Sequence, residues 1–198
     1  MFIQTSDRYK YLKFILLYYM FKKMNLFSRS GTRLLRLLAR SPSRKMYGRE
    51  ISKEAGVSTG STNQHLREFA RRGMLHVEQK GKMNFYSINL DNPVVRQLKI
   101  TFNTIELEPL IERIKNHSNR ITLFGSCAEG TDAEDSDVDV LILTGEKEKV
   151  RAEVSKFGPK IERKVSAIIV NPDDFMKLKK EDKPLYERIS RGINLGGE

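Results

Sequence analysis

The sequence predicts an α+β protein built from two modules of opposite charge. Residues 1–100 carry a net charge of +14 and residues 101–198 a net charge of −3, which together make the +11 of the whole chain. Helical periodicity followed by a β-hairpin pattern occupies the basic half, whereas aliphatic strands alternate with helices in the other half. A chain of 198 residues is long enough to give each module its own core. The basic half favours a polyanion as its partner.

An apolar run flanked by lysines occupies residues 11–21, near the start of the chain. As a helix this run would extend about 16 Å, too short for a hydrocarbon core of roughly 30 Å, so we expect no membrane span. No small-residue cleavage site follows it, which argues against a signal peptide. Two alternatives stay open for residues 1–25: a helical extension that packs on a partner subunit, or an extension upstream of a start near Met24. We favour the helical extension.

Residues 26–91 are predicted to form three helices and a hairpin. The first helix is rich in leucine and arginine, the second ends at Gly56, and Ser58 or Thr59 caps the third. Alternating segments at residues 75–79 and 84–90 then flank a basic turn. This order resembles the winged helix-turn-helix of small prokaryotic regulators, in which the third helix enters the major groove of double-stranded DNA and the hairpin contacts the backbone or the minor groove.

The resemblance implies two sets of DNA-binding residues in this module. The expected base-facing residues are Thr59, Ser61, Thr62, Asn63, His65 and Arg67. The expected phosphate contacts are Arg71, Arg72, Lys80 and Lys82. His65 by itself is predicted to be a solvent-exposed residue on a polar helix face. The alternative is that the module docks a protein and that its basic side chains are merely solvated.

Residues 92–118 keep aliphatic side chains at helical spacing after Pro93, which favours a helix start. We expect one or two helices that link the modules. Because a palindromic DNA site requires a two-fold symmetric protein, this linker is also a candidate for pairing subunits into a homodimer.

The candidate chemistry lies in residues 119–198. An apolar strand ends at Gly125-Ser126, and after ten intervening residues Asp137 and Asp139 alternate with valines at the start of another strand. Period-two alternation places both aspartates on one face. Adjacent carboxylates repel one another unless a cation lies between them, and Mg²⁺ arriving with substrate phosphates is the natural occupant. The glycine allows close backbone approach, and the exposed N–H groups and serine hydroxyl can hold a phosphate.

Gly-Ser, ten residues and Asp-x-Asp resemble the signature of the polymerase-β-like nucleotidyltransferases, and most closely the small prokaryotic minimal nucleotidyltransferases. The resemblance implies a mixed-sheet α/β domain in which Gly125 and Ser126 bind the triphosphate of an NTP and Asp137 and Asp139 hold Mg²⁺. Its members transfer a nucleotide monophosphate to an acceptor hydroxyl and often pair with a small helical protein, which becomes a further possible partner here.

Two positions depart from the pattern of that family. The third carboxylate, expected on the strand at residues 164–170, is replaced by Ser166, and Glu162 is the nearest residue that can supply it. Glu129 stands where the family usually has a basic residue. Lys160, Arg163 and Lys164 are candidates to offset the acidic loop charge. The catalytic assignment is therefore Asp137, Asp139 and Glu162.

Two functions remain open. The first is a Mg²⁺-dependent nucleotidyltransferase recruited to DNA by its winged helix, and the second is a regulator whose nucleotidyltransferase fold senses nucleotide or serves as an inactive scaffold. The single cysteine, Cys127, excludes an internal disulfide and favours a reducing cytoplasm. No histidine lies near it in the sequence, so we do not expect it to act as a nucleophile.

Overall fold

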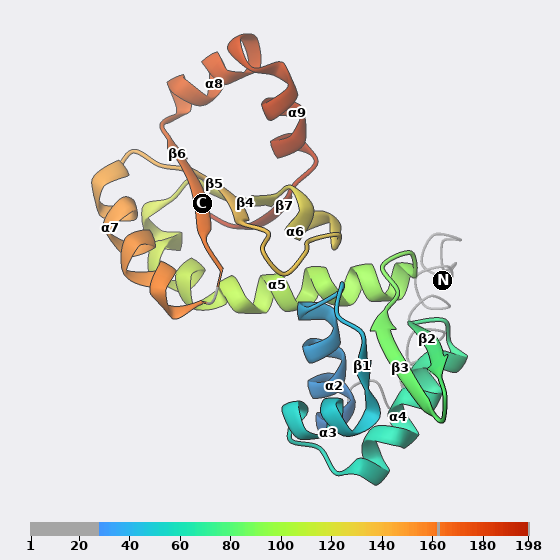
Figure 1. The fold of residues 1–198 in the computed structure, drawn as a ribbon. Helices are drawn as coiled ribbons and strands as arrows, with labels where there is room; N and C mark the ends of the chain where they lie inside the picture. Colours follow the sequence, from blue (N-terminus) through green and yellow to red (C-terminus); the bar gives the residue numbers. More distant parts are fainter. Residues whose placement is uncertain (1–27, 162, 198) are drawn as a thin grey trace, which may run out of the picture. The chain divides into compact units, whose positions relative to one another are not determined.

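The computed structural model describes residues 28–161 and 163–197, and the extension expected at residues 1–25 lies outside this range. The described chain divides into two compact units, which are treated separately below (Figure 1). The first comprises residues 28–40 and 44–88, and the second is built on residues 89–197. In the described residues no helix has the length and apolarity needed to cross a membrane.

The first unit contains three helices and a small sheet. Its elements are α2 (Arg29–Arg40), β1 (Met46–Tyr47), α3 (Gly48–Ala55), α4 (Thr59–Arg71), β2 (Leu75–Lys80) and β3 (Met83–Ile88). Helix α3 ends at Gly56, whose φ of 61° is left-handed, and the side chain of Ser58 caps α4 by accepting a hydrogen bond from the Ser61 N–H. Both caps were predicted from the sequence. The unit has the winged-helix arrangement.

The hairpin is the wing of this unit. Strands β2 and β3 pair antiparallel from Leu75–Ile88 to Lys80–Met83, so that Gly81 and Lys82 form a two-residue turn. Strand β1 adds to the free side of β3 and completes the order β1-β3-β2. Below the sheet, apolar side chains from all three helices are fully buried: Leu34, Leu35, Leu38, Ile51, Leu66 and Phe69.

The second unit is a four-stranded sheet with helices on both faces (Figure 1). Its strands are β4 (Arg120–Phe124), β5 (Val138–Leu143), β6 (Val165–Val170) and β7 (Ile193–Gly196), in the order β6-β5-β4-β7. Strands β5 and β6 are parallel while the other pairs are antiparallel, so the sheet is mixed, as predicted. Strand β7 was not predicted from the sequence, in which the strand at residues 164–170 is the last one expected.

The helices of this unit form two layers. On one face lie α5 (Pro93–Ile114), the short α6 (Ser126–Glu129) and α7 (Lys147–Phe157), with the single-turn helices η1 (Lys115–His117) and η2 (Gly158–Lys160) at their ends. On the other face lie α8 (Pro172–Glu181) and α9 (Lys183–Ser190). Leu107, Leu110 and Ile114 of α5 are buried in the core, so this helix packs as part of the sheet domain.

Candidate functional site

The Gly-Ser turn follows β4 and begins α6. Gly125 has φ 69° and ψ −157°, a conformation essentially restricted to glycine. A Cβ at this position would lie 2.5 Å from Oδ2 of Asp139, because the backbone of the turn passes directly beside that carboxylate. The turn closes at Gly130, whose missing side chain allows it to contact the backbone of Arg96 on α5. The structure therefore brings the predicted phosphate turn against one of the two predicted metal ligands.

The two aspartates flank the first residue of β5. The valines between and after them are 1% exposed and belong to the core, whereas the side chains of Asp137 and Asp139 are 40% and 26% exposed. Burial is the main cause that raises the pKa of Asp139, and the charge of Asp137 adds to it, while Arg188 and a hydrogen bond from Ser166 act in the opposite direction. A neighbouring cation therefore stabilises the charged form of Asp139 more than it would stabilise that of an isolated surface carboxylate.

The position opposite Asp139 on β6 is held by Ser166. Parallel pairing of β5 and β6 places these two residues in register, so the neighbouring strand presents a hydroxyl where the family pattern calls for a carboxylate. Glu162, the predicted substitute, lies outside the described residues. Glu129 is exposed at the end of α6.

The carboxylates of Asp137 and Asp139 are better suited to a Mg²⁺ ion that brings phosphate ligands with it than to a metal ion held by the protein alone. Within residues 28–161 and 163–197, no group of three His, Cys, Asp or Glu side chains is placed to hold a metal. Two partly exposed carboxylates beside a glycine cradle are, however, the usual protein share of a Mg²⁺ site whose remaining ligands are waters and substrate phosphates. Asp137 and Asp139 would hold such an ion.

A buried polar network, not anticipated from the sequence, supports the loop between the turn and the aspartates. Asp132 is 4% exposed and accepts from Arg163 at 3.0 Å and from Asn103 at 3.0 Å, and it pairs with Lys99 at 3.2 Å. Arg163 also binds Glu106 and Asn103, both at 2.8 Å. The network thus joins α5, the loop and the start of β6.

One signal in the sequence could have revealed part of this network. The buried stripe of α5 runs through Val95, Lys99, Asn103, Leu107, Leu110 and Ile114. Two polar residues therefore occupy core positions of an otherwise apolar stripe, which indicates a partner across the interface. Among the network residues, only Arg163 was named from the sequence, as a candidate to offset the loop charge, and Arg163 does pair with Asp132. Lys164, named for the same role, pairs with Asp137.

Cys127 lies beneath the same loop and is fully buried. Burial, assisted by the charge of Asp132, raises the pKa of its thiol to about 11. The group is therefore a neutral thiol at physiological pH, in which form it is a poor nucleophile.

The predicted DNA-facing residues of α4 fall into two groups. Thr59, Asn63 and Arg67 are exposed and Ser61 is half-buried. Thr62 and His65 are 0% and 8% exposed, so both the base-facing role given to them and the exposed status expected for His65 are wrong. They lie on the inward side of α4, where the His65 ring stacks on Phe69 with centroids 5.6 Å apart. Its Nε2 is hydrogen-bonded at 3.0 Å to the hydroxyl of Ser30.

The burial of His65 predicts a loss of stability in mild acid. Burial lowers the pKa of its imidazole below the usual value of about 6.5, so the unfolded chain takes up the proton first and unfolding becomes easier as the pH falls below that value. Urea unfolding at pH 8 and pH 5.5 should show a smaller pH effect for His65→Gln than for wild type. His76→Gln, which changes an exposed histidine, is the control and should keep the full effect.

The expected phosphate-contacting side chains are at the surface but are not all free. Arg71 and Arg72 pair with Glu68 at 2.8 and 2.6 Å. Lys80 lies 3.3 Å from Glu78 and 5.6 Å from the centre of the Phe85 ring. Lys82 is exposed at the turn of the wing.

A hollow of about 360 Å³ lies between α4 and the wing. It is lined by Tyr47, Gly48, Arg49, Thr59, Asn63, Arg67, Met83, Asn84 and Tyr86. Two arginines and no acidic residue line it, so its electrostatic character suits an anionic polymer.

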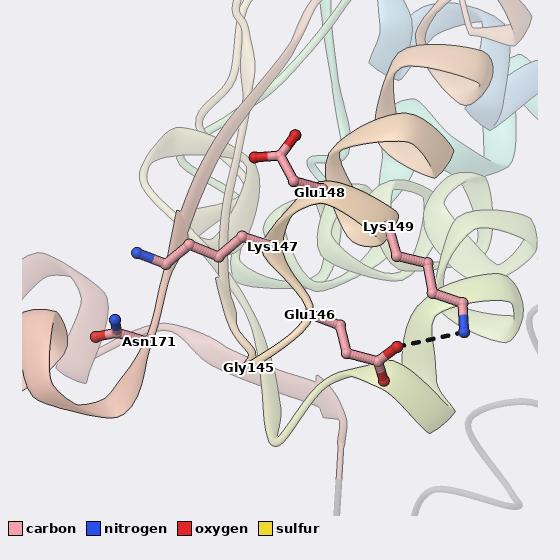
Figure 2. Close-up of a pocket in the computed structure, with 6 residues that line it drawn as sticks. All are labelled: Gly145, Glu146, Lys147, Glu148, Lys149 and Asn171. Carbon is pink, nitrogen blue, oxygen red and sulfur yellow. Dashed lines mark hydrogen bonds and ion pairs between the residues drawn. The ribbon is translucent and has the colours of Figure 1, made fainter.

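A hollow of about 490 Å³ lies in the second unit (Figure 2). It is lined by Gly145, Glu146, Lys147, Glu148, Lys149 and Asn171, around the starts of α7 and α8. Lys149 pairs with Glu146 at 3.3 Å, and Lys147 pairs with Asp174 at 2.7 Å. These residues follow the carboxyl ends of β5 and β6, whereas Asp137 and Asp139 lie at the amino end of β5, so this hollow is separate from the candidate site.

Comparison with known proteins gives one family match. Residues 105–191 match the family model described as nucleotidyltransferase domain. No curated protein matches the chain.

Several solved structures are similar to parts of the chain. A protein from E. coli assigned as a DNA-binding transcriptional regulator is 19% identical with a TM-score of 0.38, and the match covers 52% of this chain and 99% of that one. A homodimeric winged helix-turn-helix domain from Mycobacterium bovis is 17% identical with a TM-score of 0.38, covering 55% and 94%. A Sulfolobus solfataricus protein assigned as a nucleotidyltransferase is 17% identical with a TM-score of 0.33, covering 50% and 84%. Similarity at this level gives no basis for carrying over a ligand or an assembly.

Proposed function

Because residues 105–191 match the nucleotidyltransferase domain model, we propose that this protein binds a magnesium–NTP complex and transfers the nucleotide monophosphate to an acceptor hydroxyl. The observation that carries the proposal is the contact between the turn and the carboxylate. Gly125 adopts a conformation reserved for glycine, and its backbone lies against Asp139. A phosphate held by the turn and a Mg²⁺ ion held by Asp139 would then be immediate neighbours.

Each residue of the site has a role in this proposal. The backbone of the Gly125 turn and the hydroxyl of Ser126 hold the phosphates, and Asp137 and Asp139 hold the ion. An ion held by Asp137 and Asp139 would supply positive charge to the phosphates and to the leaving pyrophosphate. The buried pairing of Asp132 with Arg163 keeps the loop between the turn and β5 in place.

The nature of the base decides between the two functions. Glu162 is the residue we propose to activate the acceptor hydroxyl. Ser166, in register with Asp139, favours the second candidate, because a serine on β6 supplies neither a carboxylate base nor a strong ligand for another metal ion. In that candidate the domain binds Mg-NTP as a sensor, or serves as a scaffold, and the winged helix carries out regulation.

Calorimetry with ATP, CTP, GTP and UTP in the presence of Mg²⁺ tests the shared first step. Wild type should bind at least one of them, and Asp137→Asn/Asp139→Asn should weaken binding by about 100-fold or more, because both metal ligands are lost. Asp173→Asn, an exposed carboxylate at the start of α8, is the control and should bind like wild type. Absence of binding by the wild type would contradict the proposal.

Transfer itself is measured with the bound nucleotide labelled at its α-phosphate. Labelled product from wild type but not from Asp139→Asn supports the enzyme, and loss of product in Glu162→Gln supports that residue as base. Binding without transfer to DNA, RNA or protein acceptors supports the regulator instead.

We also propose that the first unit binds double-stranded DNA as part of a homodimer, through α4 and the wing. Asn63 and Arg67 are exposed on α4 and line the hollow together with Arg49, and Lys82 is exposed at the turn of the wing. In this proposal Arg67 and Asn63 face bases, and Arg49 and Lys82 face phosphates.

Arg67→Ala should weaken binding to DNA fragments selected by the wild type from a random library by about 5- to 150-fold, since one base contact contributes about 1–3 kcal/mol. Lys82→Ala should lower the salt dependence of binding without changing sequence preference. Arg33→Ala, on the exposed side of α2, is the control for simple loss of charge. If Arg33→Ala weakens binding as much as Arg67→Ala, α4 is not the reading helix.

A further inference from the structure

Both aspartates of the candidate site are paired with cations from their own chain. Nζ of Lys164 lies 3.0 Å from Oδ2 of Asp137, and Nη2 of Arg188 lies 3.6 Å from Oδ2 of Asp139. The two negative and two positive charges cancel. The site is therefore electrostatically balanced by the protein itself, and a metal ion that enters alone meets two competing cations.

Arg188 lies beside the phosphate turn as well as beside Asp139. Its Nη2 is 3.4 Å from the point that a Cβ of Gly125 would occupy, and its guanidinium is 5.8 Å from the centre of the Phe124 ring. The residue comes from α9, on the sheet face opposite α5. A guanidinium in this place can exchange a carboxylate for a phosphate by a small rotation, because both partners accept the same forked donor.

Both side chains have the freedom to make this exchange. The side chain of Arg188 is 59% exposed and that of Lys164 is 76% exposed. Ion pairs this exposed contribute little to folding stability. By contrast, Arg163, one residue before Lys164, is 9% exposed and held by Asp132, Glu106 and Asn103, so it is a fixed support.

We propose that Lys164 and Arg188 are exchangeable counter-ions, which neutralise Asp137 and Asp139 in the empty site and move to the phosphates when a magnesium–triphosphate complex binds. This inference rests on the proposed function and adds residues that the sequence motif does not contain. Two consequences follow. The site binds Mg²⁺ weakly without nucleotide, and metal and triphosphate bind cooperatively, because the phosphates draw away the cations that compete with the metal.

The test uses Lys164→Gln and Arg188→Gln in the full chain. Calorimetry with Mg²⁺ alone should show about two- to fivefold tighter binding in each variant, the gain expected when an exposed competing cation is removed. Binding of the tightest NTP in the presence of Mg²⁺ should instead weaken by about tenfold or more, since a charge-assisted phosphate contact is lost. Arg188→Lys should restore part of the NTP affinity.

Lys156→Gln and Arg191→Gln are matched controls. Both change exposed residues of the same types close to the two counter-ions in sequence, and both should leave each affinity near that of wild type. Circular dichroism should show unchanged folding for all variants.

The outcomes separate this inference from the proposed function. If the wild type binds no NTP with Mg²⁺, the proposed function fails and the inference falls with it. If the wild type binds NTP but the two variants leave Mg²⁺ affinity unchanged, or lose affinity for metal and nucleotide together, the exchange is overturned while the nucleotide site stands.

Discussion

Replacing Arg163 with methionine should destabilise the second unit by about 3 kcal/mol, at the low end of the range for removing one partner of a buried ion pair. The side chains of Asp132 and Glu106 are 5% and 15% exposed, so the loss of the guanidinium leaves both carboxylates with little access to water. Lys99 remains close to Asp132, which keeps the effect from being larger. The measurement is urea unfolding followed by circular dichroism, because the chain contains no tryptophan.

Arg151→Met is the matched control for this prediction. Arg151 pairs with Glu148 at 3.1 Å, but the two side chains are 60% and 86% exposed. Pairs of this kind contribute about 0–1 kcal/mol, so the control should unfold close to the wild type. If the two variants lose the same stability, the buried network is not a support of the site loop.

The second prediction with a large effect is Gly125→Ala. The residue has φ 69°, where a side chain costs about 1–3 kcal/mol, and the new Cβ would meet Oδ2 of Asp139 at 2.5 Å. The short aspartate side chain has to move away, which removes it from the position in which it would hold Mg²⁺. We therefore expect binding of Mg-NTP to be lost in calorimetry while the protein still folds.

Gly56→Ala is a control that introduces backbone strain without a contact to a carboxylate. Gly56 also has a left-handed backbone, with φ 61°, but no atom lies within 4 Å of its missing Cβ. The control should lose stability through strain and keep its affinity for Mg-NTP. Normal nucleotide binding by Gly125→Ala would show that the turn does not need its contact with Asp139.

Features that depend on neighbouring residues in the sequence were predicted correctly. The end of β4 before the Gly125-Ser126 turn follows from one apolar run, and the cap at Ser58 follows from local hydrogen bonding to the next backbone N–H groups. The alternation of Asp139 with buried valines follows from the two-residue period of a strand. Motif spacing also predicted that the Gly125 turn and Asp139 belong to one site.

Features that depend on which face of an element is covered could not be predicted from local sequence. Thr62 and His65 are polar and lie on a polar helix, yet they face inward because α4 packs against α2 and β2. Strand β7 is short and contains glycine, and it becomes a strand by pairing with β4. Short-range patterns contain no information about either packing partner.

The candidate site divides in the same way. Local sequence is enough to predict the turn, Asp137 and Asp139, since their chemistry and spacing are local. Only the fold determined that Lys99 and Asp132 share a buried pair, that Ser166 stands beside Asp139, and that Arg188 reaches Asp139 from α9. These contacts join residues far apart in the chain, and their energies depend on burial and distance, which only the packed structure sets.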